Sequence, residues 1–175
     1  ALRGLLLIFS QIKTIKVMEI KLQAQWITDA KDSIIAKGET NDCVVYATAS
    51  AFGLTYDQAH PIVRERFNRP DRKGTRTINI IKEMKRMVET QESINGQCIK
   101  EIISKATKVY HTYGKDVERK NRVSTFIKEH NTGTYLILTS NHALTVKDGM
   151  MIDNITKGSG KSFVKRAFKV EPVGS

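Results

Sequence analysis

Residues 142–153 carry the sequence HALTVKDGMMID, which predicts a β-hairpin. Apolar and β-branched residues flank Asp148 and Gly149, and Asp-Gly is a preferred two-residue turn between antiparallel strands. If these two residues form the whole loop, Lys147 pairs with Met150. The hairpin therefore fixes the register of the sheet that the C-terminal third of the chain is expected to form.

The same register decides which side chains lie beside His142. Counting back from the turn pairs Leu144 with Asp153, and alternation puts His142 and Leu144 on one face. Asp153 is then diagonal to His142, at roughly 7–8 Å between backbones, which two side chains can span. Asn154 falls on the other face, but a three-residue loop would bring it beside His142 instead. Loop length thus decides between a carboxylate and an amide.

Cys43 stands at the start of a predicted buried helix. Residues 43–52 are small or apolar, with no glycine or proline, and Gly53 follows where a helix normally ends. Asn41 or Asp42 can cap the N-terminus of this helix. A thiol in the first turn ionises more readily because the helix dipole and the unpaired N–H groups favour negative charge. Cys43 is therefore a candidate nucleophile.

Together these residues suggest a three-residue catalytic group. Cys43 would attack a carbonyl carbon, His142 would hold and return the proton, and Asp153 would fix the orientation of the imidazole. The backbone N–H of Cys43 is a candidate donor to the oxyanion, and the side chain of Asn41 is a candidate second donor.

Each of these residues also has a purely structural interpretation. Cys43 could be an inert core thiol, His142 a strand residue with a satisfied ring, Asp153 a turn residue and Asn41 a helix cap. Their joint occurrence, with the cysteine first and the facial geometry matching, favours a catalytic or formerly catalytic site.

The cysteine and histidine segments resemble those of the papain-like cysteine peptidase superfamily, especially its NlpC-type branch. Residues 38–43 and 56–60 are also similar to stretches of small papain-like proteins encoded by bacteriophages. The resemblance covers most of residues 38–155 and implies a papain-like fold, with the roles of nucleophile, base and orienting residue already given. The chain departs from the family in having no glutamine shortly before the cysteine, and in having Val44 after it.

The remaining periodicity predicts an α+β domain with N-terminal helices packed on a C-terminal antiparallel sheet. Pro61 is expected to kink or shorten the second helix. Residues 1–17 are expected to be an extension, and 18–175 a single papain-like domain. Helices are expected at 43–52, at 55–67, from Thr75 or Thr77 through Val88, and at 124–130. Strands are expected at 97–104, 108–113, 135–139, 142–147, 150–153 and 163–170.

Cysteine usage and hydrophobicity limit the class of protein. Cys43 and Cys98 lie in unlike contexts without metal-ligand spacing, so no disulfide framework, metal site or cofactor is expected. The apolar run at residues 5–9 is too short for a membrane span. We expect a reducing, cytoplasmic location, which would be the host cytoplasm or the virion if the protein is phage-encoded.

The net charge of +11 is concentrated in the middle of the chain. Residues 61–128 carry 17 Lys and Arg against 8 Asp and Glu, a net charge of +9. Such a region attracts polyanions, so nucleic acid or an acidic protein is a possible partner. The simpler interpretation is a solvated face, because aromatic residues are not interleaved with the charges.

Two functions follow as expectations. The first is a cysteine hydrolase that cleaves a peptide or isopeptide-type amide of a peptide or protein substrate through an acyl-enzyme. The alternative is a catalytically silent papain-like phage structural or host-interaction protein that binds nucleic acid or an acidic partner through residues 61–128. A hydrolase that uses the basic region to hold an anionic substrate would combine both features.

Overall fold

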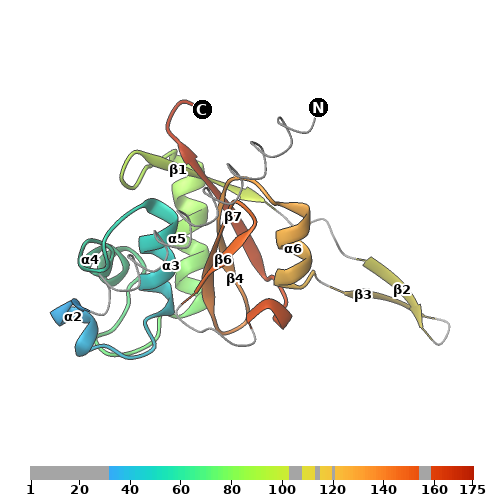
Figure 1. The fold of residues 1–175 in the computed structure, drawn as a ribbon, viewed down its shortest axis with the longest axis horizontal. Coiled ribbons are helices and arrows are strands. Elements are labelled where there is room, and N and C mark those ends of the chain that lie inside the picture. The colour runs from blue at the N-terminus through green and yellow to red at the C-terminus, as the bar shows by residue number, and fades with distance from the viewer. Residues whose placement is uncertain (1–31, 103–107, 113–114, 120, 154–158) are drawn as a thin grey trace, which may run out of the picture.

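The computed structural model describes residues 32–102, 108–112, 115–119, 121–153 and 159–175, which form an α+β fold (Figure 1). The expected extension at 1–17 and Asn154 lie outside the described residues. The helices are α2 (Ile34–Lys37), α3 (Cys43–Phe52), α4 (Tyr56–Arg66), α5 (Thr77–Thr90), α6 (Val123–Glu129) and the 3₁₀ helix η1 (Ser159–Lys161). The strands are β1 (Gln97–Ile102), β2 (Lys108–Thr112), β3 (Lys115–Arg119), β4 (Thr134–Leu138), β5 (Ala143–Lys147), β6 (Met150–Ile152) and β7 (Arg166–Pro172).

The main sheet has five antiparallel strands in the order β1-β7-β4-β5-β6, and β2 pairs with β3 in a separate two-stranded sheet. Lys147 pairs with Met150 across the β5–β6 turn, which confirms the two-residue loop. Asp148 and Gly149 have φ values of 48° and 76°, and both central residues of a type I′ turn need positive φ.

Helices cover both faces of this sheet (Figure 1). On one face, Leu136, Leu138 and Phe168 pack with apolar residues of α3, α4 and α5. On the other face, Ile137 and Leu144 belong to a second cluster that includes residues of α6. The N-terminal helices therefore pack on the sheet as predicted, and the sheet is buried on its second face as well.

The hydroxyl of Thr145 joins α3 to β5. It donates to the carbonyl oxygen of Ala47 at 2.8 Å and accepts from the hydroxyl of Ser50, also at 2.8 Å. Thr145 is fully buried, so both bonds are shielded from water. This contact fixes the helix that begins at Cys43 against the strand that follows His142.

Helix α4 begins as predicted but does not end early. Thr55 forms a capping box with Gln58, since each side chain accepts from the other residue's backbone N–H, at 3.2 and 2.9 Å. The expected shortening at Pro61 is wrong, because the helix continues to Arg66. Pro61 and Asp57, whose carbonyl would accept the missing bond, are both exposed, so water can satisfy that carbonyl.

Other element boundaries differ from the predicted ones. The last strand begins at Arg166 instead of 163, and Phe163 makes only an isolated bridge to Arg122. The sheet also takes β1 from the middle of the chain, as the partner of β7. The charged strand β3, KDVER, was not predicted because it lacks apolar alternation. None of the helices in the described ranges is long and apolar enough to cross a membrane.

Replacing Thr145 by valine should destabilise the protein by about 1–3 kcal/mol, because the isosteric change removes one hydrogen-bond partner from the half-buried Ser50 hydroxyl and one from the buried Ala47 carbonyl. Urea unfolding measures this cost. Thr134→Val, at a half-buried position of β4, is the control and should change the unfolding free energy by less than about 0.5 kcal/mol. Equal losses in the two variants would contradict the role of the hydroxyl.

Candidate active site

Cys43 is the first residue of α3 and is half-buried. Asp42 is the N-cap residue, but its side chain makes no capping hydrogen bond, so the predicted side-chain cap is wrong. The Asp42 carboxylate instead accepts from the hydroxyl of Tyr56 at 2.7 Å. Burial first, and then this hydrogen bond, raise the pKa of Tyr56 well above its usual value, so the hydroxyl stays a donor.

The backbone at the start of α3 offers donors beside the thiol. The N–H groups of Val45 and Tyr46 both donate to the carbonyl oxygen of Asp42, at 2.8 and 3.2 Å. The N–H groups of Cys43 and Val44 have no acceptor within the part of the chain that the structure describes. A helix N-terminus with unpaired N–H groups stabilises negative charge.

Hydrogen bonds fix both the backbone and the ring of His142. Its carbonyl oxygen accepts from the backbone N–H and the hydroxyl of Thr139, at 2.9 and 3.1 Å. Its Nε2 lies 2.7 Å from Oδ1 of Asp153. The two side chains are only 13% and 4% exposed, so this ion pair is largely shielded from solvent. The structure thus brings together the two residues that the hairpin register predicts to meet.

The electrostatic environment keeps the His142 ring protonated. The hydrogen bond from Asp153, and next the interaction with the Cys43 side chain, raise the pKa of His142 to about 10, against the opposing effect of burial. Because Asp153 occupies Nε2, Nδ1 is the nitrogen left for the thiol. The N-terminus of α3 thus places the Cys43 side chain beside a protonated imidazole ring.

Asn41 lies at the rim of this group. It is exposed and has a φ of 55°, a left-handed conformation that asparagine tolerates better than most residues. A Cβ placed on Gly74 would lie 3.6 Å from the Cβ of Asn41. Among the described residues, the Asn41 side chain makes no hydrogen bond. Its role as an oxyanion donor therefore stays a prediction.

A buried ionic network that the sequence did not predict supports the loop before Cys43. Glu39 accepts from Arg69 at 2.7 Å and lies 2.8 Å from Nε2 of His60. Arg69 also donates to the carbonyl oxygen of Thr40 at 3.3 Å, and its side chain is only 1% exposed. The hydrogen bond from Arg69 is the main reason that the pKa of Glu39 falls to about 2. The three residues are up to 30 positions apart, and no local pattern links them.

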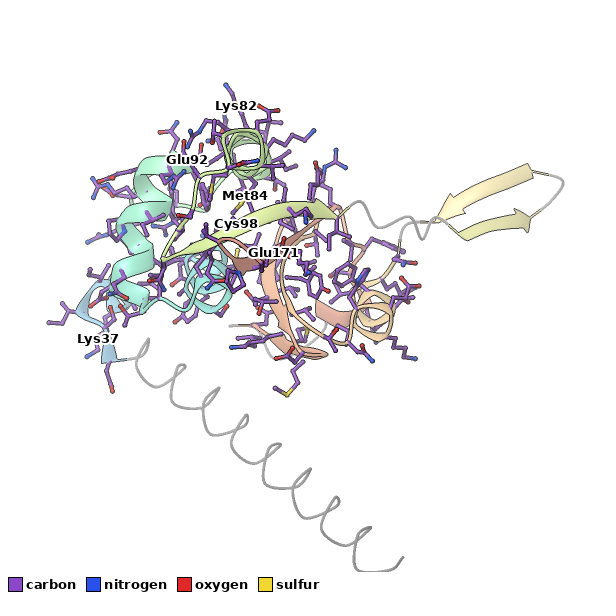
Figure 2. All side chains as sticks on the ribbon, turned by 90° about the horizontal axis from the view of Figure 1, so that it is seen from above. Lys37, Lys82, Met84, Glu92, Cys98 and Glu171 are labelled. Atoms are coloured by element: carbon purple, nitrogen blue, oxygen red, sulfur yellow. The ribbon has the colours of Figure 1, made fainter. Side chains whose placement is uncertain are left out.

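The second thiol lies elsewhere in the fold. Cys98 is on β1, where its Sγ contacts the carbonyl oxygen of Glu171 at 3.4 Å (Figure 2). It is half-buried like Cys43 but has no imidazole hydrogen-bonded to it within the described ranges. No group of three or more His, Cys, Asp or Glu side chains among the described residues could hold a metal ion.

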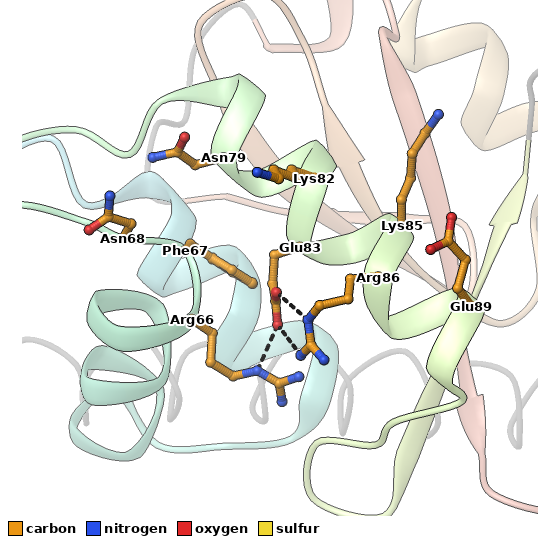
Figure 3. A pocket seen from close by; sticks show the side chains of 9 residues that line it. All are labelled: Arg66, Phe67, Asn68, Asn79, Lys82, Glu83, Lys85, Arg86 and Glu89. Atoms are coloured by element: carbon orange, nitrogen blue, oxygen red, sulfur yellow. Dashed lines mark hydrogen bonds and ion pairs between the residues drawn. The ribbon is translucent and has the colours of Figure 1, made fainter.

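A pocket of about 600 Å³ lies at α4 and α5 and does not include Cys43, His142 or Asp153 (Figure 3). Inside it, Glu83 accepts from Arg66 at 2.9 Å and from Arg86 at 2.8 Å. Both arginines of this pocket are therefore paired with an internal carboxylate. It is lined by Arg66, Phe67, Asn68, Asn79, Lys82, Glu83, Lys85, Arg86 and Glu89.

Comparison of the chain with models of known families, with curated proteins and with solved structures gave no match.

Replacing Asp153 by asparagine should lower the pKa of His142 from about 10 toward the ordinary 6.5, because the largest stabilising contact of the imidazolium is lost. NMR titration of the ring protons measures this shift. Asp32→Asn, which removes an exposed carboxylate, is the control and should leave the titration unchanged. A His142 ring that is neutral at about pH 8 in the unmodified protein would contradict the account.

The same shift gives the sign of a stability effect. The folded-state pKa of His142 lies above the unfolded value, so the protonated ring stabilises the fold fully below pH 6.5 and loses this contribution as the pH rises through 10. The difference in unfolding free energy between the unmodified protein and Asp153→Asn should therefore shrink across that window.

Proposed function

We propose that the protein is a papain-like cysteine hydrolase that cleaves a peptide or isopeptide-type amide through an acyl-enzyme intermediate. One observation carries this proposal. The ring of His142 is hydrogen-bonded to Asp153 at 2.7 Å and also interacts with Cys43 at the N-terminus of α3. A cysteine at the start of a helix, followed along the chain by a histidine at the start of a strand, matches the order that the papain-like superfamily uses.

In the first half of the reaction, the thiolate of Cys43 attacks the carbonyl carbon of the scissile amide, and a C–S bond forms. The carbonyl oxygen becomes an oxyanion and accepts from the N–H of Cys43. Nδ1 of His142 then gives its proton to the amide nitrogen. The C–N bond breaks, the amine product leaves and a thioester remains on Cys43.

In the second half, His142 acts as the base. Its neutral Nδ1 takes a proton from a water molecule while the water oxygen attacks the thioester carbon. The C–S bond breaks, the acid product leaves, and the thiolate and imidazolium are restored. Asp153 holds Nε2 throughout, so Nδ1 stays aimed at the thiol and at the leaving group.

Asn41 is the proposed second donor to the oxyanion. It precedes Cys43 by two residues, and its side chain makes no competing hydrogen bond among the described residues. The papain-like family places a glutamine shortly before its cysteine, whereas the nearest glutamines that precede Cys43 in this chain are Gln23 and Gln25. The proposal therefore assigns an amide of a different residue to the same task.

The alternative, a catalytically silent papain-like protein that binds nucleic acid or an acidic partner through residues 61–128, depends on net charge alone. Arg66, Arg69 and Arg86 of this region are bonded to carboxylates inside the protein. Part of the positive charge of residues 61–128 is thus already neutralised by carboxylates of the same protein. The buried ion pair of His142 with Asp153 beside a cysteine supports the hydrolase instead.

Alkylation by iodoacetamide tests the proposal. At neutral pH in the folded protein, Cys43 should react at least about tenfold faster than Cys98, since among the described residues Cys43 has an imidazolium partner and Cys98 has none. Both thiols are half-buried, so Cys98 serves as an internal control. His142→Ala should bring the rate at Cys43 down to near that of Cys98. If Cys43 reacts no faster than Cys98 in the unmodified protein, the activated nucleophile is excluded.

A further inference from the structure

We propose that the loop at residues 71–76, DRKGTR, selects polypeptide substrates that carry carboxylate side chains close to the scissile amide. This inference rests on the proposed hydrolase function and adds a substrate class to it. Three observations carry it: where the loop lies, which of its charges are unpaired, and how it differs from the other basic surface of the protein.

The loop lies against the segment that leads into Cys43. The hydroxyl of Thr40 donates to the carbonyl oxygen of Arg72 at 2.9 Å. Gly74 faces Asn41, since a Cβ at this glycine would lie 3.6 Å from the Asn41 Cβ and 3.8 Å from its carbonyl oxygen. The residues that the loop contacts, Thr40 and Asn41, precede the nucleophile by three and two positions.

The other end of the loop reaches the segment that leads into His142. Thr77, the first residue of α5, donates from its hydroxyl to the carbonyl oxygen of Ser140 at 3.4 Å. Ser140 belongs to the turn between β4 and β5 and precedes His142 by two residues. The loop and the residue that follows it therefore contact both segments, the one that leads into the thiol and the one that leads into the imidazole.

Three cations of this loop make no ion pair among the residues that the structure describes. Arg72, Lys73 and Arg76 are exposed, and none of them makes an ion pair within the described ranges. The one acidic residue of the loop, Asp71, is already paired with Arg64 at 3.2 Å. The rim of the candidate site thus carries three uncompensated positive charges.

The pocket at α4 and α5 differs in this respect. Its two arginines share the carboxylate of Glu83 (Figure 3). Both also pair with Glu92, which lies 2.5 Å from Arg66. Among the described residues, the loop at residues 71–76 therefore has more cations without an ion-pair partner than the pocket has. An anionic ligand gains more from unpaired cations, because it does not have to displace an internal carboxylate.

The position of the cations favours an acidic polypeptide as the occupant. They border a thiol and an imidazole whose chemistry acts on a carbonyl carbon, and nucleic acid offers no amide in its backbone for this reaction. A polypeptide can place an amide at Cys43 and, a few residues away, an Asp or Glu side chain at the loop. One bound polypeptide then contacts both the nucleophile and the cations of the loop.

The first arm of the test compares two alkylating reagents, iodoacetate and iodoacetamide, which differ in negative charge. The variant R72Q/K73Q/R76Q should lower the iodoacetate-to-iodoacetamide rate ratio at Cys43 by about threefold or more at low ionic strength, and high salt should remove the difference. The control K82Q/K85Q/K128Q removes three exposed cations of α5 and α6 and should keep the original ratio.

The second arm measures cleavage. Peptides with Asp or Glu near the cleaved bond should be hydrolysed with a higher kcat/KM than the matching Asn or Gln peptides, and R72Q/K73Q/R76Q should lose this preference. The control variant should retain it. Melting temperatures of the variants, which alter exposed side chains only, should match that of the unmodified protein.

The outcomes separate the two proposals. Slow labelling of Cys43 by both reagents, no faster than Cys98, would refute the hydrolase and the inference with it. Fast labelling of Cys43 with an unchanged reagent ratio in R72Q/K73Q/R76Q would refute the loop inference alone. If that variant lost binding to a single-stranded oligonucleotide while keeping its preference for acidic peptides, nucleic acid would be the partner of the loop and the inference would be wrong.

Discussion

The two-residue turn at Asp148 and Gly149 is the constraint on which the candidate site depends. Both residues adopt positive φ, and the turn pairs Lys147 with Met150. Side chains alternate along a strand, so a slip of one residue would move the whole of β6 to the other face. The observed register instead brings Asp153 to the ring of His142. A local property of the turn therefore sets the ionisation of a histidine several residues away.

A second contact brings the nucleophile to this pair. The Thr145 hydroxyl binds α3 through Ala47 and Ser50, whereas Leu144 faces the cluster under α6. His142 precedes the first paired residue of β5, at the end of the strand. From there its ring meets Asp153, which directly follows β6, and Cys43 of α3. Because α3 covers the face opposite to Leu144, strict alternation along β5 would have pointed His142 away from Cys43.

The sequence predicts what depends on neighbouring residues. The helix at 43–52, the hairpin and the meeting of His142 with Asp153 follow from periodicity and turn chemistry, and the structure confirms them. The network of Arg69 with Glu39 could not be predicted, because a buried ion pair between distant residues leaves no periodic signal. The predicted capping of α3 by the side chain of Asn41 or Asp42 is wrong for the same reason, since Tyr56, fourteen residues after Asp42, donates to the Asp42 carboxylate.

The proposed hydrolysis requires Cys43 and His142 to form a thiolate–imidazolium pair that Asp153 holds in place. The ultraviolet absorbance of a thiolate measures this pair directly. At neutral pH, the spectrum of the unmodified protein minus that of Cys43→Ser should show close to one thiolate, and the same difference measured in a His142→Ala background should show close to none. A difference spectrum without thiolate absorbance in the unmodified protein would contradict the account.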